Sequence, residues 1–302
     1  MKPVETCSAL DWLLEGADNP AVAYRARTEL LGEGAGVSLA ADASQTIAAS
    51  QAAAWIYGKL PDNWHEISGL WYRYYLSALA ECGLDTAQVE RAHVQRAFTE
   101  LDSSFDLGCG DLMLLRALVR LGYADEPAVR RRLDSLTHHA LPDGGYLCLH
   151  RLKKLKHAPK SCYKANLYAL LLAGECRKLG VPLDDGALAR YFLSRDIFYR
   201  SDDRSALVLG GRPGWRAVDV FHPFETMRVG LHNIVEALCA LGLGHEPQVL
   251  AAREMLRAKR DEAGRVILEG TLTKSYLPKE RVGKPSKWAT LYALLAEKHA
   301  AR

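Results

Sequence analysis

Three cysteines stand where a metal ion or a reactive thiol could be placed. Cys109 lies near the predicted start of one apolar helix, Cys148 in the loop before the next, and Cys162 near the start of that next helix. With a histidine they could form a Cys3His zinc site. The candidate fourth ligands are His150, His157 and His222. Inert core thiols and a reactive thiol are the two other interpretations of the same cysteines.

Acidic and histidine side chains are predicted at the starts of the apolar helices. The candidates for acid–base catalysis are Asp111, Asp219, His222 and Glu225. A carboxylic acid can donate a proton near neutral pH only if burial raises its pKa. The same residues could instead cap helices and hold loops in place.

Aromatic and basic residues near the same helix starts could line a binding pocket. This set comprises Trp64, His65, Trp71, Tyr163, Lys284, Lys287 and Trp288. Helix N-termini present unpaired N–H groups and the positive end of the helix dipole. A pocket among them would bind an anionic or polar head group, with apolar walls below for a hydrophobic tail. Aromatic packing between helices would produce the same pattern.

Helices must position these residues, because apolar side chains recur every three or four positions and strand signals are nearly absent. Strongly apolar runs, typical of buried helices, cover residues 70–84, 112–121, 165–179, 229–243 and 288–296. We expect these buried helices to begin near residues 64, 108, 160, 218 and 284. Amphipathic helices are predicted between them, over residues 86–101, 126–136 and 246–259.

The four joints that follow the first four buried helices resemble one another, since in each the helix ends at a glycine. Helix pairs of roughly 50 residues cannot bury their apolar faces alone and must stack. We therefore predict an all-α fold: one (α/α) toroid of about five or six helix pairs, spanning residues 1–302 as a single domain. Its inner helices would run parallel and share their N-terminal ends. An open helical solenoid is the alternative.

Composition narrows the function classes. The formal charge of +3 on 302 residues is too balanced to indicate a nucleic-acid partner. We expect no signal peptide and no membrane span, hence a cytoplasmic protein whose seven cysteines are reduced thiols or metal ligands. The oligomeric state cannot be read from the sequence.

Several motifs resemble those of the terpenoid-cyclase and protein-prenyltransferase superfamily. The string LPDGGYLC at 141–148 is similar to its DGG-aromatic loop, and residues 262–269 look like a degenerate copy. The strings DNPAVAYR at 18–25 and GKPSKWATL at 283–291 resemble bacterial single-toroid proteins described as prenyltransferase or squalene-oxidase repeat proteins, an uncharacterised branch. The resemblance implies the toroid and a pocket for a hydrophobic, isoprenoid-like molecule.

The catalytic signatures of that superfamily are incomplete in this chain. The D-x-D-D motif of the cyclases is absent. The prenyltransferase zinc motif D-G-C-Y corresponds to residues 160–163, where Cys162 and Tyr163 match but Lys160 replaces the aspartate. The expected function is therefore binding of a hydrophobic small molecule, with or without cyclase- or transferase-like catalysis. The alternative is a non-catalytic helical scaffold that binds a protein partner.

Overall fold

The computed structural model describes residues 5–15, 18–33, 53–54, 56, 69–104, 108–148, 161–222, 228–271 and 280–302. Every regular element in these residues is a helix, and the loops add only isolated β-bridges. The all-α prediction is therefore confirmed. None of the described helices is long and apolar enough to cross a membrane.

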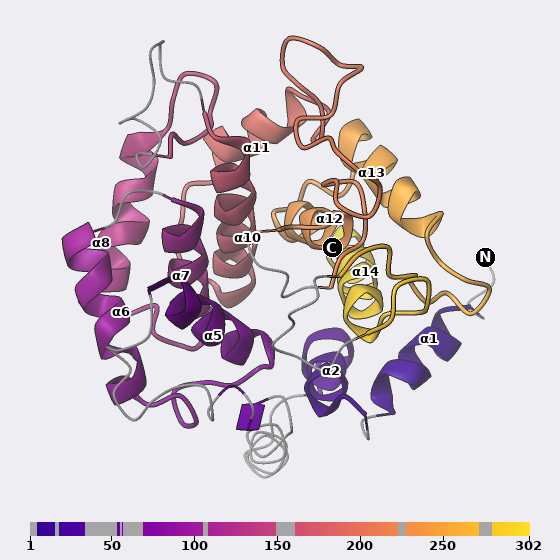
Figure 1. The fold of residues 1–302 in the computed structure, drawn as a ribbon, viewed down its shortest axis with the longest axis horizontal. Helices are drawn as coiled ribbons and strands as arrows, with labels where there is room; N and C mark the ends of the chain where they lie inside the picture. Colours follow the sequence, from indigo (N-terminus) through magenta and orange to yellow (C-terminus); the bar gives the residue numbers. More distant parts are fainter. Residues whose placement is uncertain are drawn as a thin grey trace.

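Five buried helices follow one another around the molecule (Figure 1). They are α5 (Gly69–Glu81), α7 (Cys109–Arg120), α10 (Tyr163–Leu179), α12 (Leu231–Ala240) and α14 (Lys287–Ala300). Each packs against the next in this order, and their apolar faces meet in one hydrophobic cluster. These inner helices coincide with the five apolar runs of the sequence.

Five other helices lie outside them (Figure 1). They are α1 (Glu5–Leu14), α6 (Arg91–Ser104), α8 (Pro127–Leu136), α11 (Gly186–Leu193) and α13 (Pro247–Arg257), with a short 3-10 turn, η3 (Thr137–His139), after α8. Each of these helices packs on at least one inner helix. The predicted alternation of buried and amphipathic helices is thus present in the described residues.

A short segment joins the two ends of the inner series. It consists of α2 (Pro20–Arg25) and the π-helix η1 (Ala26–Leu31), and both contact α14. Arg25, at the end of α2, also reaches Glu81 at the end of α5. The closed toroid stays a prediction, because residues 34–52 and 57–68, between η1 and α5, lie outside the described residues.

The predicted start of one inner helix is wrong. We expected a helix from about residue 218, but α12 begins at Leu231. The backbone near Val218 is held otherwise: Val220 accepts hydrogen bonds from the N–H groups of Glu269 and Gly270, at 3.0 Å each. These bonds, with the bridge between Phe221 and Gly270, hold this part of the backbone outside a helix.

The loops that lead into α10 and α14 are built alike. In the first, the N–H of Tyr146 donates to the side-chain oxygen of Asn166 on α10, at 2.8 Å. In the second, the N–H of Val266 donates to the hydroxyl of Thr290 on α14, at 2.9 Å. The two helix residues are each four positions after the N-cap of their helix. The two loops therefore make the same contact to the helix that follows them, as the predicted repeat requires.

Close packing between α10 and α12 leads to a prediction about Gly174. A Cβ atom at Gly174 would lie 3.1 Å from both Cα and Cβ of Ala237. Gly174→Leu should therefore lower the free energy of unfolding by about 1–3 kcal/mol through overpacking, measured by urea denaturation. Gly174→Ala should cost less, because its gain in helix propensity offsets part of the crowding. A leucine variant as stable as the wild type would contradict this packing.

Candidate functional site

A buried charge network joins the C-terminal ends of the inner helices. In the described residues it contains four cations and four carboxylates: Arg25, Arg116, Arg120, Lys178, Glu29, Glu81, Glu175 and Glu236. Helices α5, α7, α10 and α12 and the α2–η1 segment all contribute to it. Its members come together because the inner helices run in the same direction, as predicted.

Arg25 lies at the centre of this network. Its side chain is fully buried, and its Nη1 lies 2.8 Å from Glu81 Oε1. Its Nη2 donates to Glu29 Oε2 at 3.0 Å, and its Nη1 also lies 3.3 Å from the hydroxyl of Tyr292. The guanidinium carbon is 5.2 Å from the Tyr292 ring centroid. Arg25 therefore connects η1, α5 and α14.

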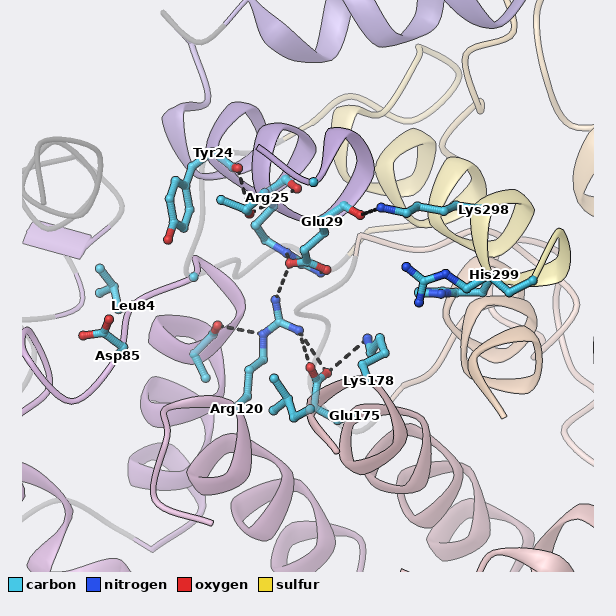
Figure 2. A pocket seen from close by; sticks show the side chains of 16 residues that line it. Tyr24, Arg25, Glu29, Leu84, Asp85, Arg120, Glu175, Lys178, Lys298 and His299 are labelled. Atoms are coloured by element: carbon cyan, nitrogen blue, oxygen red, sulfur yellow. Dashed lines mark hydrogen bonds and ion pairs between the residues drawn. The ribbon is translucent and has the colours of Figure 1, made fainter. Parts of the chain in front are cut away.

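Arg120 and Lys178 connect the remaining helices. Arg120 Nη1 donates to both oxygens of Glu175, at 3.0 and 2.9 Å, and its Nη2 donates to Glu29 at 3.1 Å. Lys178 Nζ donates to Glu236 at 3.0 Å. Figure 2 shows Arg120 between Glu29 above it and Glu175 below it. Each carboxylate thus contacts at least one cation from another element.

The cations keep these carboxylates ionised despite their burial. Burial alone would raise the pKa of Glu81, but the guanidinium groups of Arg116, Arg120 and Arg25 lower it to about 2. The pKa of Glu175 is likewise held well below its usual range: burial opposes the shift, but Arg120 and Lys178 outweigh it. The network is therefore a set of fixed charges at neutral pH rather than a source of protons.

A pocket of about 440 Å³ opens beside this network (Figure 2). Its lining comes from α2, η1, α5, α7, α10 and α14, and includes Arg25, Glu29, Asp85, Arg120, Glu175, Lys178, Lys298, His299 and Arg302. It lies at the C-terminal ends of the inner helices, the end opposite to the one where sequence reasoning looked for a site. Its charged residues were missed because they are spaced like ordinary polar positions on separate helices.

The three candidate cysteines do meet at the N-terminal ends of α7 and α10. The thiols of Cys109 and Cys162 hydrogen-bond one another, and this contact, together with burial, raises the pKa of Cys109. Cys148 lies close enough to raise it further. No three His, Cys, Asp or Glu side chains of the described residues are arranged to hold a metal ion. The zinc site stays a prediction, because the candidate ligands His150 and His157 lie outside the described residues, and the buried cysteines form no disulfide within them.

Each of the two candidate aspartates contacts an arginine and backbone N–H groups. Asp111 is 2.6 Å from Arg73 Nη1 and accepts the N–H of Gly108, which begins α7. Asp219 accepts hydrogen bonds from Arg216 and from two backbone N–H groups. Burial opposes ionisation of Asp219, but these bonds lower its pKa. The expected raised pKa of an acid catalyst is therefore wrong for Asp219.

The candidate pocket residues that the structure describes contact different neighbours. Trp71 stacks on Tyr75, and the Tyr163 hydroxyl donates to the carbonyl of Ile197 at 2.9 Å. Lys287 is buried and lies 2.7 Å from Asp18, whereas Lys284 is exposed. Trp288 is buried against Arg25. Residues Trp64, His65, His150, His157 and Glu225 lie outside the described residues.

His222 is buried, as expected for a site residue, and a second histidine accompanies it. His232, on α12, is completely buried, with its ring packed edge-on against Tyr292 at 5.6 Å. Neither ring nitrogen of His232 has a hydrogen-bond partner among the described residues. Burial and the neighbouring His222 lower its pKa to about 3. His232 was not among the predicted site residues. A histidine inside the apolar run 229–243 is the sequence feature that could have identified it.

Comparison of the chain with protein-family models, curated proteins and solved structures gave no match. The resemblance to terpenoid cyclases and prenyltransferases therefore stays a prediction from sequence motifs. Function has to follow from the chemistry of the side chains themselves.

The charge network leads to a stability prediction. Glu175→Gln would leave Arg120 and Lys178 buried without their shared carboxylate, so unfolding free energy should fall by about 3–5 kcal/mol in urea denaturation. The matched control is Asp102→Asn, which breaks an exposed ion pair with Arg131 and should cost less than about 1 kcal/mol. If both variants lost the same free energy of unfolding, the network would contribute no more to stability than an exposed ion pair.

The buried histidine leads to a prediction about pH. The pKa of His232 is about 3 in the folded protein, against 6.5 for a free side chain. Below about pH 6.5 the unfolded chain binds a proton at His232 that the folded chain does not, so His232 lowers stability as pH decreases, whereas Glu280, whose pKa burial raises to about 7, raises stability over the same range. The network carboxylates add a second loss of stability as pH decreases, and this loss begins only near the usual glutamate pKa of 4.5.

The two contributions can be separated by urea denaturation at a series of pH values. Relative to the wild type, His232→Leu should lose less stability between about pH 6.5 and 5.5 and should show the same loss of stability below about pH 4.5. An unchanged slope in the upper range would show that His232 is not buried as a neutral imidazole.

Proposed function

We propose that the protein binds a hydrophobic, isoprenoid-like small molecule among its inner helices, and that His232 hydrogen-bonds the polar group of this ligand. The observation that carries the proposal is the complete burial of His232 with both ring nitrogens lacking a partner among the described residues. Nearly all buried polar groups in proteins have a hydrogen-bond partner. A ligand that supplies one would explain the exception.

A neutral imidazole is suited to this task. It offers one N–H donor and one nitrogen acceptor, which together match a hydroxyl group. The low pKa of His232 keeps the ring neutral at physiological pH. An unmade hydrogen bond here costs about 1–3 kcal/mol, and a bound ligand would recover that energy.

The surroundings of His232 favour a ligand that is mostly apolar. The ring packs on Tyr292, and Phe221 lies next to the backbone that begins α12. Both aromatic side chains are buried, as is Trp288 one turn before Tyr292. Sites of this kind combine apolar walls with a few polar groups that orient the ligand. His222, which is also buried, supplies a second imidazole nearby.

The scaffold alternative would draw support from a large exposed apolar surface. In the part of the chain that the structure describes, the large apolar side chains that are exposed are Leu31, Leu179, Leu250 and Val282. They belong to four different segments: η1, α10, α13 and the loop before α14. Single exposed apolar residues are ordinary on protein surfaces, so they do not favour a protein partner.

The proposal is tested with farnesol and the matching hydrocarbon farnesene, titrated against the intrinsic tryptophan fluorescence of the full chain. His232→Leu should weaken farnesol binding about 10-fold, because one hydrogen bond of about 1.4 kcal/mol is lost. Farnesene binding should change little. The variant without ligand should be at least as stable as the wild type above pH 7, because an unpaired polar group is removed.

The matched control is His299→Leu, which removes an imidazole 3.4 Å from Glu236. It should reduce stability and leave farnesol affinity unchanged. The proposal would be overturned if the wild type bound neither farnesol nor farnesene, or if His232→Leu bound farnesol as tightly as the wild type.

A further inference from the structure

We infer that the pocket at the C-terminal ends of the inner helices is a second binding site, for a small molecule carrying a phosphate group or two carboxylates. This site is separate from that of the hydrophobic ligand, because His232 does not line the pocket. Its volume of about 440 Å³ is that of a typical small-molecule site.

The charges that line the pocket are unbalanced. Its lining residues include five cations, Arg25, Arg120, Lys178, Lys298 and Arg302, and three carboxylates, Glu29, Asp85 and Glu175. A concave site with excess positive charge concentrates anions, since low-dielectric walls focus the field. Arg25, Arg120 and Lys178 are already paired with network carboxylates, so the positive charge that remains for an anionic ligand is that of Lys298 and Arg302.

The two carboxylates at the back of the pocket are already engaged. Glu29 contacts Arg25 and Arg120, and Glu175 contacts Arg120 and Lys178. The pKa of each is lowered, since the contacting cations outweigh the effect of burial. These groups hold the arginines in place and are not available to neutralise the cations at the rim.

The rim cations come from the end of α14. Lys298 Nζ donates to two uncharged acceptors, the carbonyl oxygens of Glu29 and Leu30, at 2.6 and 2.9 Å. An ammonium group has three donors, so one is left for a ligand. Arg302 is exposed and forms no ion pair within the described residues. Figure 2 shows Lys298 and His299 on one side of the pocket and Arg120 on another.

The pocket combines a fixed cation, Arg120, with two cations on long side chains at its opening, Lys298 and Arg302. Arg120 is fixed by Glu175, Glu29 and the carbonyl of Ala80, so it needs no reordering when an anion arrives. Lys298 and Arg302 have long side chains that can close on the ligand from the rim. Preorganised charge of this kind lowers the cost of binding.

The test is isothermal titration calorimetry of the full chain with pyrophosphate, succinate and chloride at constant ionic strength. We expect saturable 1:1 binding of pyrophosphate, succinate or both, and none of chloride. Pyrophosphate alone would identify a phosphate-bearing ligand, and succinate alone a dicarboxylate. The absence of saturable binding for both would overturn the inference.

The pocket is located by a double variant, Lys298→Gln with Arg302→Gln, which should weaken binding about 10-fold or more. The matched control is Arg130→Gln with Arg131→Gln, which removes the same charge from the exposed face of α8 and should change affinity less than about 2-fold. If both double variants weakened anion binding equally, the binding would reflect only general charge attraction, and the proposed site would be wrong. The affinity for farnesol should be unchanged in the pocket variant, so the two proposed sites are tested independently of each other.

Discussion

The ion pairs at the C-terminal ends of the inner helices are the interaction on which the packing of the structure depends. Each inner helix from α5 to α12 brings a charge that another element neutralises. Placing arginine and lysine at helix C-termini also suits the helix dipole. Because these charges are buried, removal of one leaves its partners in an apolar environment without compensation. The relative positions of the helices are thereby coupled, and the pocket takes its shape from this coupling.

The two ends of the inner helices are fixed by different means. At the C-terminal ends, side-chain charges make the connections. At the N-terminal ends, the loops before α10 and α14 donate backbone N–H groups to the side chains of Asn166 and Thr290, and Asp111 holds the start of α7. Aspartates there serve the backbone, which explains why the carboxylate chosen as an acid catalyst, Asp219, has a lowered pKa.

Much of the fold could be predicted because it follows from local patterns. Apolar periodicity located the inner helices, and glycines such as Gly83 and Gly242, with φ of 88° and 83°, marked their ends. The charge network could not be found in this way. Arg25 and Glu81 are 56 positions apart, and nothing in their local sequence distinguishes them from solvated surface residues. The start of α12 was misplaced because its preceding segment is held by residues near 270, far along the chain.

The contacts of Arg25 constrain the order in which the molecule can assemble during synthesis. Arg25 is made early, but its partner Tyr292 follows 267 positions later, and Lys298 reaches back to the carbonyls of Glu29 and Leu30 over a similar span. Until α14 has left the ribosome, α2 and η1 lack the surface on which they dock. The first helices of the chain therefore complete their packing last, and nascent chains that stop before α14 would expose a charged, unfinished edge to chaperones and proteases.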